Sequence, residues 1–239
     1  MKRALVTGGS GGIGAAIARR LAADGHHVLV HANRQAARAA EVVAEIRNTG
    51  GSAESVCFDI TDAAATGAAL EAVLTDGPIS ILVNNAGLHA DAVFPGMGPD
   101  TWRQVIDVNL NGFYNVTQPL TMPMIRGRWG RIITITSVAG LVGNRGQVNY
   151  SAAKGALHAA TKSLAQELAS RGITVNAVAP GIVATAMIEG SFDQATIERL
   201  VPMKRAGRPE EVADLVAFLA SDQATYITGQ IISINGGMV

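Results

Sequence analysis

Short apolar runs alternate with longer segments of mixed polarity along the whole chain. Apolar runs of about four to eight residues are typical of strands that are buried on both faces of a sheet. They predict strands at 4–7, 28–31, 55–58, 79–83, 131–136, 173–179 and 230–234.

The segments between these runs place hydrophobic residues three or four positions apart. Ile17 and Leu21 show this spacing, which puts both side chains on one face of a helix. Pro99 is a favoured first-turn residue, and Pro119 and Pro123 are expected to kink or end pieces of the helix that begins there. Helices are predicted at 12–23, 36–46, 61–74, from 99 through 113 and beyond, at 149–171, within 185–203 and at 210–220.

This alternation indicates parallel strands joined by helices that cover both faces of the sheet. The 239 residues contain no internal repeat, low-complexity linker or break in composition. The predicted fold class is therefore α/β, a single domain over residues 1–239 with a doubly wound parallel sheet of about seven strands. Ligands of such sheets bind beyond the carboxyl ends of the strands.

Composition narrows the classes of function. Hydrophobic residues make up 48% of the chain and aromatic residues 4%, so aliphatic side chains form most of the core. The 19 Lys and Arg residues balance 19 Asp and Glu residues, which argues against nucleic acid or an anionic membrane as the main partner. No apolar run approaches the roughly 18–20 residues of a membrane span, and no secretion signal precedes the first strand, so we expect a cytoplasmic protein.

Cys57 is the single cysteine, so no disulfide can form within the chain. Because it lies in a predicted buried strand, we expect it in the core rather than at a nucleophilic site. The five histidines are scattered along the sequence, and we expect no metal site.

A glycine-rich stretch lies between the first predicted strand and the first predicted helix. Such a turn lets the backbone approach a phosphate, and the helix that follows supplies free N–H groups. The stretch fits two nucleotide-binding templates, G-x-G-x-x-G at 9–14 and T-G-x-x-x-G-x-G at 7–14. By itself it leaves both templates open, and a plain tight turn also fits. Its candidate cofactor-binding residues are Gly8, Ser10, Gly11, Gly12, Ile13 and Gly14.

The end of the second predicted strand indicates which dinucleotide is bound. The G-x-G-x-x-G template expects an acidic residue about 20 positions on, which binds the ribose 2′-hydroxyl. Here the strand is followed by Asn33 and Arg34, without a carboxylate. Arg34 can bind a 2′-phosphate through a charge-assisted hydrogen bond. The sequence therefore favours NADPH/NADP over NAD, against the alternative that Arg34 is a solvated turn residue.

Five ordered motifs resemble those of the short-chain dehydrogenase/reductases: Thr7-Gly8-x-x-x-Gly12-x-Gly14, Asn84-Asn85-Ala86-Gly87, Ser137, Tyr150-x-x-x-Lys154 and Pro180-Gly181. The resemblance covers the whole chain and implies a Rossmann-type fold with a substrate lid at 186–203. It favours the T-G-x-x-x-G-x-G template. One departure is Gly11, where NADP-dependent members often carry Arg or Lys. The NADP preference therefore depends on Arg34 and Asn33.

The same resemblance implies a set of functional residues. The implied catalytic residues are Asn109, Ser137, Tyr150 and Lys154, and the implied substrate contacts are Ser137, Gln147 and Tyr150. Besides the glycine stretch, the implied cofactor contacts are Asn33, Arg34, Asp59, Ile60, Asn85, Ala86, Gly87, Tyr150, Lys154, Pro180, Gly181, Val183 and Thr185.

The residue types suit carbonyl reduction. Tyr150 and Lys154 are four apart, so they share one face of a helix. An ammonium about 4 Å from a phenol, at an effective dielectric near 20, contributes about 4 kcal/mol, which would bring a pKa of about 10 near neutrality. Tyr150 would then act as a general acid, and the Ser137 hydroxyl would donate to the substrate oxygen. By resemblance, Asn109 holds a water in a proton relay to Lys154.

Segments 130–133, 147–154, 170–176 and 226–238 are similar to the 3-oxoacyl-[acyl-carrier-protein] reductases. This similarity implies NADPH-dependent reduction of 3-oxoacyl chains on acyl-carrier protein, in fatty-acid or related acyl or polyketide synthesis. It also implies a homotetramer and docking of the acidic carrier at Arg128 and Arg171. Two alternatives stay open: a reductase of another carbonyl compound (acetoacetyl-CoA, a sugar, a steroid or a quinone), and a catalytically silent dinucleotide-binding regulator. The intact catalytic set argues against the regulator.

Overall fold

In the computed structural model, which describes residues 1–185 and 193–239, seven parallel strands form one sheet. The strand order is β3-β2-β1-β4-β5-β6-β7, so the chain reverses direction across the sheet between β1 and β4. This confirms the predicted doubly wound parallel sheet. The strands are β1 (Arg3–Val6), β2 (His27–Ala32), β3 (Ser52–Cys57), β4 (Ile79–Asn84), β5 (Gly130–Ile135), β6 (Ile173–Pro180) and β7 (Ile231–Ile234).

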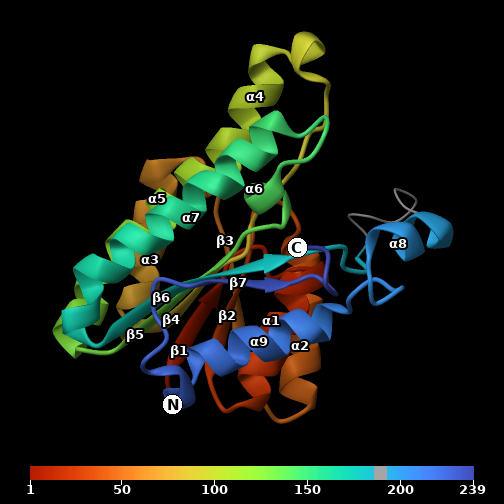
Figure 1. Ribbon diagram of the computed structural model, residues 1–239. Coiled ribbons are helices and arrows are strands. Elements are labelled where there is room, and N and C mark those ends of the chain that lie inside the picture. Colours follow the sequence, from red (N-terminus) through yellow and green to blue (C-terminus); the bar gives the residue numbers. More distant parts are fainter. Residues whose placement is uncertain (186–192) are drawn as a thin grey trace.

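Helices connect the strands and cover both faces of the sheet (Figure 1). The α-helices are α1 (Gly12–Ala23), α2 (Ala36–Asn48), α3 (Ala63–Leu74), α4 (Pro99–Ile106), α5 (Gly112–Gly127), α6 (Ala139–Val142), α7 (Val148–Leu168), α8 (Gln194–Leu200) and α9 (Pro209–Ala220). Short 3₁₀ turns lie at Phe94–Gly96, Ala169–Arg171 and Asp222–Ala224.

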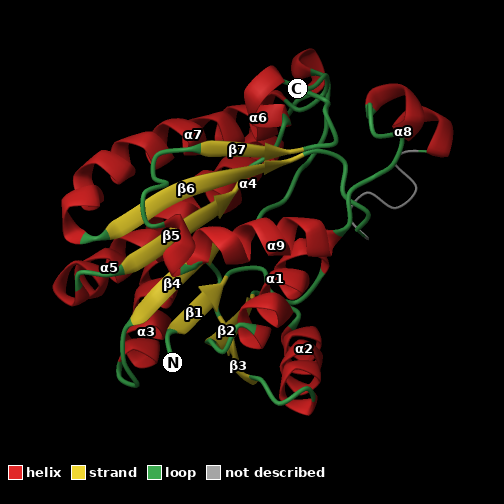
Figure 2. Cartoon of the chain, turned by 60° about the horizontal axis from the view of Figure 1, so that its bottom comes forward, coloured by secondary structure: helices red, strands yellow, loops and turns green. Residues whose placement is uncertain are grey.

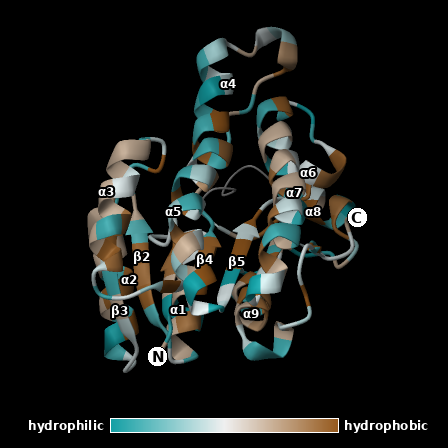
Figure 3. Ribbon diagram, turned by 90° about the vertical axis from the view of Figure 1, so that its left-hand side faces the viewer, coloured by the Kyte–Doolittle hydropathy of each residue, from teal (hydrophilic) through white to brown (hydrophobic). Residues whose placement is uncertain are grey.

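The helices form one layer on each side of the sheet, as Figure 2 shows. Successive strand residues point to opposite faces. Ala4 and Val6 therefore belong to the core beneath α1, α2 and α9, whereas Leu5 belongs to the core beneath α3, α5 and α7. In Figure 3, β2 and β4 are largely hydrophobic and α4 is largely hydrophilic. The two buried layers fix the sheet between them.

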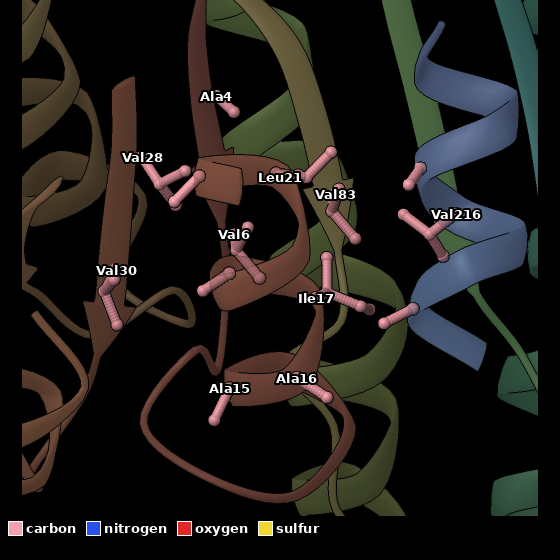
Figure 4. Packing of buried hydrophobic residues seen from close by; sticks show 14 of the residues in the cluster. Ala4, Val6, Ala15, Ala16, Ile17, Leu21, Val28, Val30, Val83 and Val216 are labelled. Carbon is pink, nitrogen blue, oxygen red and sulfur yellow. The ribbon is translucent and has the colours of Figure 1, made fainter. Parts of the chain in front are cut away.

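Helix α1 packs at the centre of one layer. Ile17 and Leu21, which the spacing rule placed on one face, are both completely buried. Figure 4 shows them between the strand residues Val6 and Val83 and the α9 residue Val216. This packing holds the start of α1, and with it the glycine stretch, at the carboxyl end of β1.

The two prolines do not end a helix, as one of their two predicted effects would require. Pro119 and Pro123 both lie inside the continuous helix α5. The interruption comes earlier, where Asp107–Asn111 form a π-helical turn between α4 and α5. Such turns contain one residue more than the α-helical period and often occur at functional sites.

The predicted burial of Cys57 is also wrong. The thiol is exposed, because β3 is the edge strand of the sheet. An apolar run does not distinguish an edge strand from a central one.

The predicted lid at 186–203 lies partly outside the described residues, which resume at Asp193 and form α8. Within residues 1–185 and 193–239, no helix combines the length and apolar character that a membrane crossing requires.

Candidate active site

The glycine stretch packs directly against the end of β4. Gly8 has a left-handed backbone with φ of +62°. Its carbonyl accepts a hydrogen bond of 3.0 Å from the Asn85 side-chain amide. A Cβ at Gly14 would overlap the Gly8 carbonyl and lie 2.5 Å from the Asn85 amide nitrogen. Only glycine fits at position 14.

Thr7 joins the same two segments. Its hydroxyl donates to the Val83 carbonyl at 3.3 Å and accepts the backbone N–H groups of Asn85 and Ala86, each at 3.0 Å. This contact gives the threonine of the T-G-x-x-x-G-x-G template a physical role. The structure therefore supports that template over G-x-G-x-x-G.

The start of α1 is suited to bind an anion. In the described part of the chain, the backbone N–H groups from Ser10 to Ile13 have no hydrogen-bond partner. They lie at the positive end of the α1 dipole. Thr185 covers the turn from the other side, since its methyl carbon is 3.5 Å from where a Cβ of Gly12 would lie. The turn therefore fits a dinucleotide pyrophosphate.

Asn33, Arg34 and Asp59 meet beyond the ends of β2 and β3. The Asp59 carboxylate accepts the N–H and the hydroxyl of Thr61 at 2.9 and 2.7 Å. These two bonds, together with the Asn33 amide and the Arg34 charge, hold the pKa of Asp59 below its usual value. The buried Ile60 packs against Gly112, the first residue of α5.

Arg38 is a residue that the sequence reasoning missed. A Cβ at Gly11 would lie 3.7 Å from the Arg38 Nη2 atom, so the guanidinium lies beside Gly11. The neighbouring Gln35 accepts a 3.4 Å hydrogen bond from Ser10. The start of α2 therefore forms one wall of the site and brings in a second arginine besides Arg34.

The four predicted catalytic residues converge from three segments: Asn109 from the π-helical turn, Ser137 from the loop after β5, and Tyr150 and Lys154 from α7. Tyr150 and Ser137 share a side-chain hydrogen bond. The Lys154 Nζ atom lies 5.6 Å from the centre of the Tyr150 ring and donates to the Ile135 carbonyl at 2.9 Å.

The pKa of the Tyr150 phenol differs from the one that the sequence predicts. Burial raises the pKa of Tyr150, the Ser137 hydrogen bond lowers it, and the Asp91 charge raises it. Burial also lowers the pKa of Lys154 to about 8. The near-neutral phenol expected from an ammonium at close range is therefore wrong for this structure, because desolvation dominates. A protonated phenol is the form that can donate a proton.

Asn109 and Lys154 face a small polar cavity. The Asn109 amide donates to the carbonyls of Leu88 and Val105 at 2.7 and 2.9 Å. Its buried Oδ1 atom has no partner within the described residues. A cavity of about 10 Å³ lies beside it, lined also by Lys154 and Thr134. That is room for about one water molecule.

Gly87 keeps this pair accessible. A Cβ there would lie 2.7 Å from the Asn109 Oδ1 atom and 3.3 Å from the Lys154 Nζ atom.

Gln147 lies at the rim of the site, where its amide donates to both oxygens of Asp91 at 2.9 and 3.1 Å. Asp91 also bonds to His89 at 3.0 Å, and the His89 ring lies 6.3 Å from the Tyr150 ring, edge to face. Asp91 was not predicted, since no motif singles it out.

Across residues 1–185 and 193–239, no three His, Cys, Asp or Glu residues are arranged to hold a metal ion.

The segment after β6 lies beside the Ser137 loop. The Pro180 carbonyl accepts the Val138 N–H at 2.9 Å, and the Gly181 N–H donates to Ile234 at 3.0 Å. Val183 is buried and pairs with Gly207. Pro180 and Gly181 thus lie beside the loop that carries Ser137, and the nicotinamide contacts of Pro180, Gly181 and Val183 stay a prediction.

Arg128 and Arg171 are neighbours, because the Arg128 guanidinium donates to the Ser170 carbonyl at 3.3 Å. They precede β5 and β6 and therefore lie at the amino edge of the sheet, opposite the other site residues. Along α7, Leu168 lies 18 positions after Tyr150, which corresponds to about 27 Å. The structure does not bring these arginines to the catalytic residues of the same chain.

Comparison with known proteins identifies this arrangement. Residues 2–196 match the family described as short chain dehydrogenase. The chain belongs to this family. The chain is 46% identical over 236 residues to the 3-oxoacyl-[acyl-carrier-protein] reductase FabG of Aggregatibacter actinomycetemcomitans, covering 98% of each protein. It is 47% identical over 238 residues to the 3-oxoacyl-[acyl-carrier-protein] reductase of a Synechocystis species, covering 99% of this chain and 96% of the relative.

Membership in the short-chain dehydrogenase family makes the protein an oxidoreductase that acts on a carbonyl or hydroxyl group and binds a nicotinamide dinucleotide. The bound group would supply a hydride to the substrate carbon, or accept one. The residues at the carboxyl edge of the sheet fit such a group, because the N–H groups from Ser10 to Ile13 have no partner among the described residues and can bind its phosphates.

The buried charge of Lys154 leads to a prediction about stability. A shift of the pKa from 10.5 to about 8 corresponds to a cost of about 3 kcal/mol for holding the charged lysine in the fold. This cost applies below the folded pKa and disappears as the pH rises to the unfolded value. We expect Lys154→Met to raise the melting temperature at neutral pH by about 5 °C or more, and the gain to shrink toward pH 10. Turnover should fall by about 100-fold or more.

Calorimetry at both pH values measures this difference. The exposed Lys162, on the same helix, provides the matched control, and Lys162→Met should change neither stability nor turnover appreciably. A lower melting temperature for Lys154→Met at neutral pH would contradict the account of the buried charge.

Proposed function

We propose that the protein is an NADPH-dependent 3-oxoacyl-[acyl-carrier-protein] reductase. The observation that carries the proposal is the identity of 45–47% over nearly the full length to relatives with this name, including that of Staphylococcus aureus. The convergence of Asn109, Ser137, Tyr150 and Lys154 at one edge of the sheet supports it. A cytoplasmic location, the lid at 186–203 and the homotetramer expected from the sequence are part of the same proposal.

The proposed chemistry adds a hydride and a proton across the 3-oxo group. The Ser137 hydroxyl donates to the carbonyl oxygen and stabilises the negative charge that develops there. Tyr150 delivers its phenolic proton to that oxygen, which completes the 3-hydroxyl group. The raised pKa of Tyr150 supports this role, since the phenol is protonated before the reaction.

Lys154 and Asn109 support the proton donor. Lys154 is proposed to hold the nicotinamide ribose hydroxyls and to favour the phenolate left on Tyr150. The unpartnered Oδ1 atom of Asn109 and the cavity of about 10 Å³ support a water that links Asn109 to Lys154 and returns a proton. Gln147 and the neighbouring Asp91 are proposed to border the thioester.

The direct test is a steady-state comparison of substrates and cofactors. We expect NADPH consumption with 3-oxoacyl chains on acyl-carrier protein, slower turnover with acetoacetyl-CoA, and a higher KM for NADH than for NADPH. Tyr150→Phe should reduce the rate by about 100-fold or more, because it removes the proton donor while leaving the ring in place. Turnover of a sugar, steroid or quinone without turnover of acyl thioesters would favour the other carbonyl substrates.

NADPH preference is proposed to depend on two arginines. Arg34 follows β2 and Arg38 covers Gly11, so both can reach a 2′-phosphate, and no carboxylate follows β2 to repel it. Each charge-assisted hydrogen bond is worth about 1.5–3 kcal/mol. Arg34→Ala and Arg38→Ala should therefore each raise the KM for NADPH by about tenfold or more. The KM for NADH should change little.

Arg47 is the control for these variants, because it lies on α2 like Arg38 but donates to the Ala53 carbonyl at 2.9 Å. Arg47→Ala should leave the ratio of the two KM values unchanged. An unchanged ratio in both Arg34→Ala and Arg38→Ala would mean that the 2′-phosphate binds elsewhere.

Carrier docking at Arg128 and Arg171 is proposed to act between subunits. Because these arginines lie far along α7 from Tyr150, a carrier bound there would present its acyl chain to the site of a neighbouring subunit in a homotetramer. Reversing both charges to Glu should lower kcat/KM for carrier-bound substrate about tenfold and leave CoA-bound substrate nearly unchanged.

Arg19 is exposed on α1, which covers the face of the sheet opposite to α7, and Arg19→Glu is the control. Equal losses on the carrier-bound and CoA-bound substrates would rule out docking at this pair.

A further inference from the structure

We propose that His31 is a positioning residue for the dinucleotide, whose neutral side chain holds the glycine turn in its binding conformation. This inference rests on the proposed cofactor site. It concerns a histidine that no motif of the sequence singles out and that touches neither the catalytic residues nor the expected phosphates.

His31 lies near the end of β2 and is only 2% exposed. The Gly8 N–H donates to its Nδ1 atom at 3.1 Å. Its Nε2 atom lies 3.0 Å from the Phe58 carbonyl oxygen. Because an N–H is a donor and a carbonyl is an acceptor, Nδ1 must carry the lone pair and Nε2 the proton. The two partners together specify one neutral tautomer.

The same residue also fixes the next peptide of the turn. The Gly9 N–H donates to the His31 backbone carbonyl at 2.8 Å. Two consecutive N–H groups of the turn therefore point inward to one residue. The N–H groups that remain for a phosphate are those from Ser10 to Ile13. His31 thus determines which part of the turn faces the ligand.

His31 also links the turn to the adenosine side of the site. Its ring lies against the Phe58 ring, with 4.2 Å between the ring centres. Phe58 directly precedes Asp59, and Asn33 and Arg34 follow β2 two and three positions after His31. A movement of the His31 ring would therefore be transmitted to the phosphate turn and to the proposed 2′-phosphate contacts.

Protonation would break this arrangement. A proton on Nδ1 would place two donors face to face, the imidazolium and the Gly8 N–H. Burial lowers the pKa of His31, while the Phe58 hydrogen bond and the Asp59 charge oppose that change. Asp59, beyond β3, is the charged group that acts on His31, and Arg34 lies beside it; the glycine turn contributes backbone groups only. The hydrogen bond from the Gly8 N–H to the His31 Nδ1 atom is therefore present at neutral pH and is lost in acid.

Titration calorimetry with NADP⁺ tests the inference without requiring turnover. At about pH 7.5, where the imidazole is neutral, His31→Leu should weaken binding about tenfold, since the Gly8 N–H loses its buried acceptor. His31→Asn should stay within about threefold of the unsubstituted protein, because its Oδ1 atom can take the place of Nδ1 as acceptor. Unchanged binding in His31→Leu would overturn the inference.

His27 is the matched control on the same strand. Its ring bonds to Ser52 at 2.7 Å and to Glu54 at 3.2 Å, so it also joins β2 to β3, but at the end far from the site. We expect His27→Leu to lower the melting temperature about as much as His31→Leu and to leave the Kd for NADP⁺ unchanged. Equal weakening of binding by both variants would overturn the positioning role and indicate a general loss of sheet stability.

A pH series separates an acceptor from a positive charge. The phosphate of NADP⁺ itself titrates near pH 6, so the informative quantity is the Kd of the unsubstituted protein divided by that of His31→Asn at each pH. This ratio should rise as the pH is lowered from about 7.5 and His31 takes up a proton. A falling ratio would mean that the imidazolium attracts the phosphates, which contradicts the proposal.

Binding of NADP⁺ by the unsubstituted protein tests the proposed cofactor site itself. If it failed to bind NADP⁺ at any pH, the proposed cofactor site would be wrong and the inference would fall with it. Normal binding that His31→Leu leaves intact would overturn the inference alone.

Discussion

The close contact between the Gly8 carbonyl, the Gly14 backbone and the Asn85 side chain is the constraint on which the rest of the site depends. It exists because β1 and β4 are neighbours in the sheet although the chain passes through β2 and β3 between them. A side chain at position 14 would separate the two strand ends. With the contact in place, the phosphate turn and the loop that leads to Asn109 share one edge of the sheet. The proposed cofactor and the proposed proton donor can then meet.

The site also concentrates costs of burial that the surrounding core must offset. Lys154 is buried with a depressed pKa, and the Oδ1 atom of Asn109 lacks a partner within the described residues. Buried polar groups of this kind are unfavourable unless a ligand or water completes them. The two hydrophobic layers on either side of the sheet supply the stability against which such groups are tolerated. Perturbed groups gathered at one edge are typical of functional sites.

Much of this arrangement could be predicted from the sequence. The alternation of apolar runs and helical spacing predicted all seven strands, and the helices between them predicted that the strands run parallel. The periodicity of hydrophobic residues does not predict the position of a strand in the sheet or an interruption within a helix. It could not tell that β3 is an edge strand, which leaves Cys57 exposed, or that a π-helical turn interrupts the helix at Asn109 while Pro119 lies inside α5.

The residues that were missed share a physical reason. Arg38, Asp91 and His31 act through contacts between elements that are distant in sequence, and no spacing along the chain reveals such contacts. The raised pKa of Tyr150 was missed for a related reason, because desolvation depends on the packing of the whole site. Sequence motifs identified the side chains that do chemistry, whereas the supporting contacts required the fold.

A crystal structure of the protein with NADP⁺ tests the central claim most directly. The account predicts pyrophosphate oxygens within hydrogen-bond distance of the N–H groups from Ser10 to Ile13, the 2′-phosphate between Arg34 and Arg38, and the nicotinamide ring beside Tyr150 and Pro180. A dinucleotide bound away from the glycine turn, or with its nicotinamide remote from Tyr150, would contradict it.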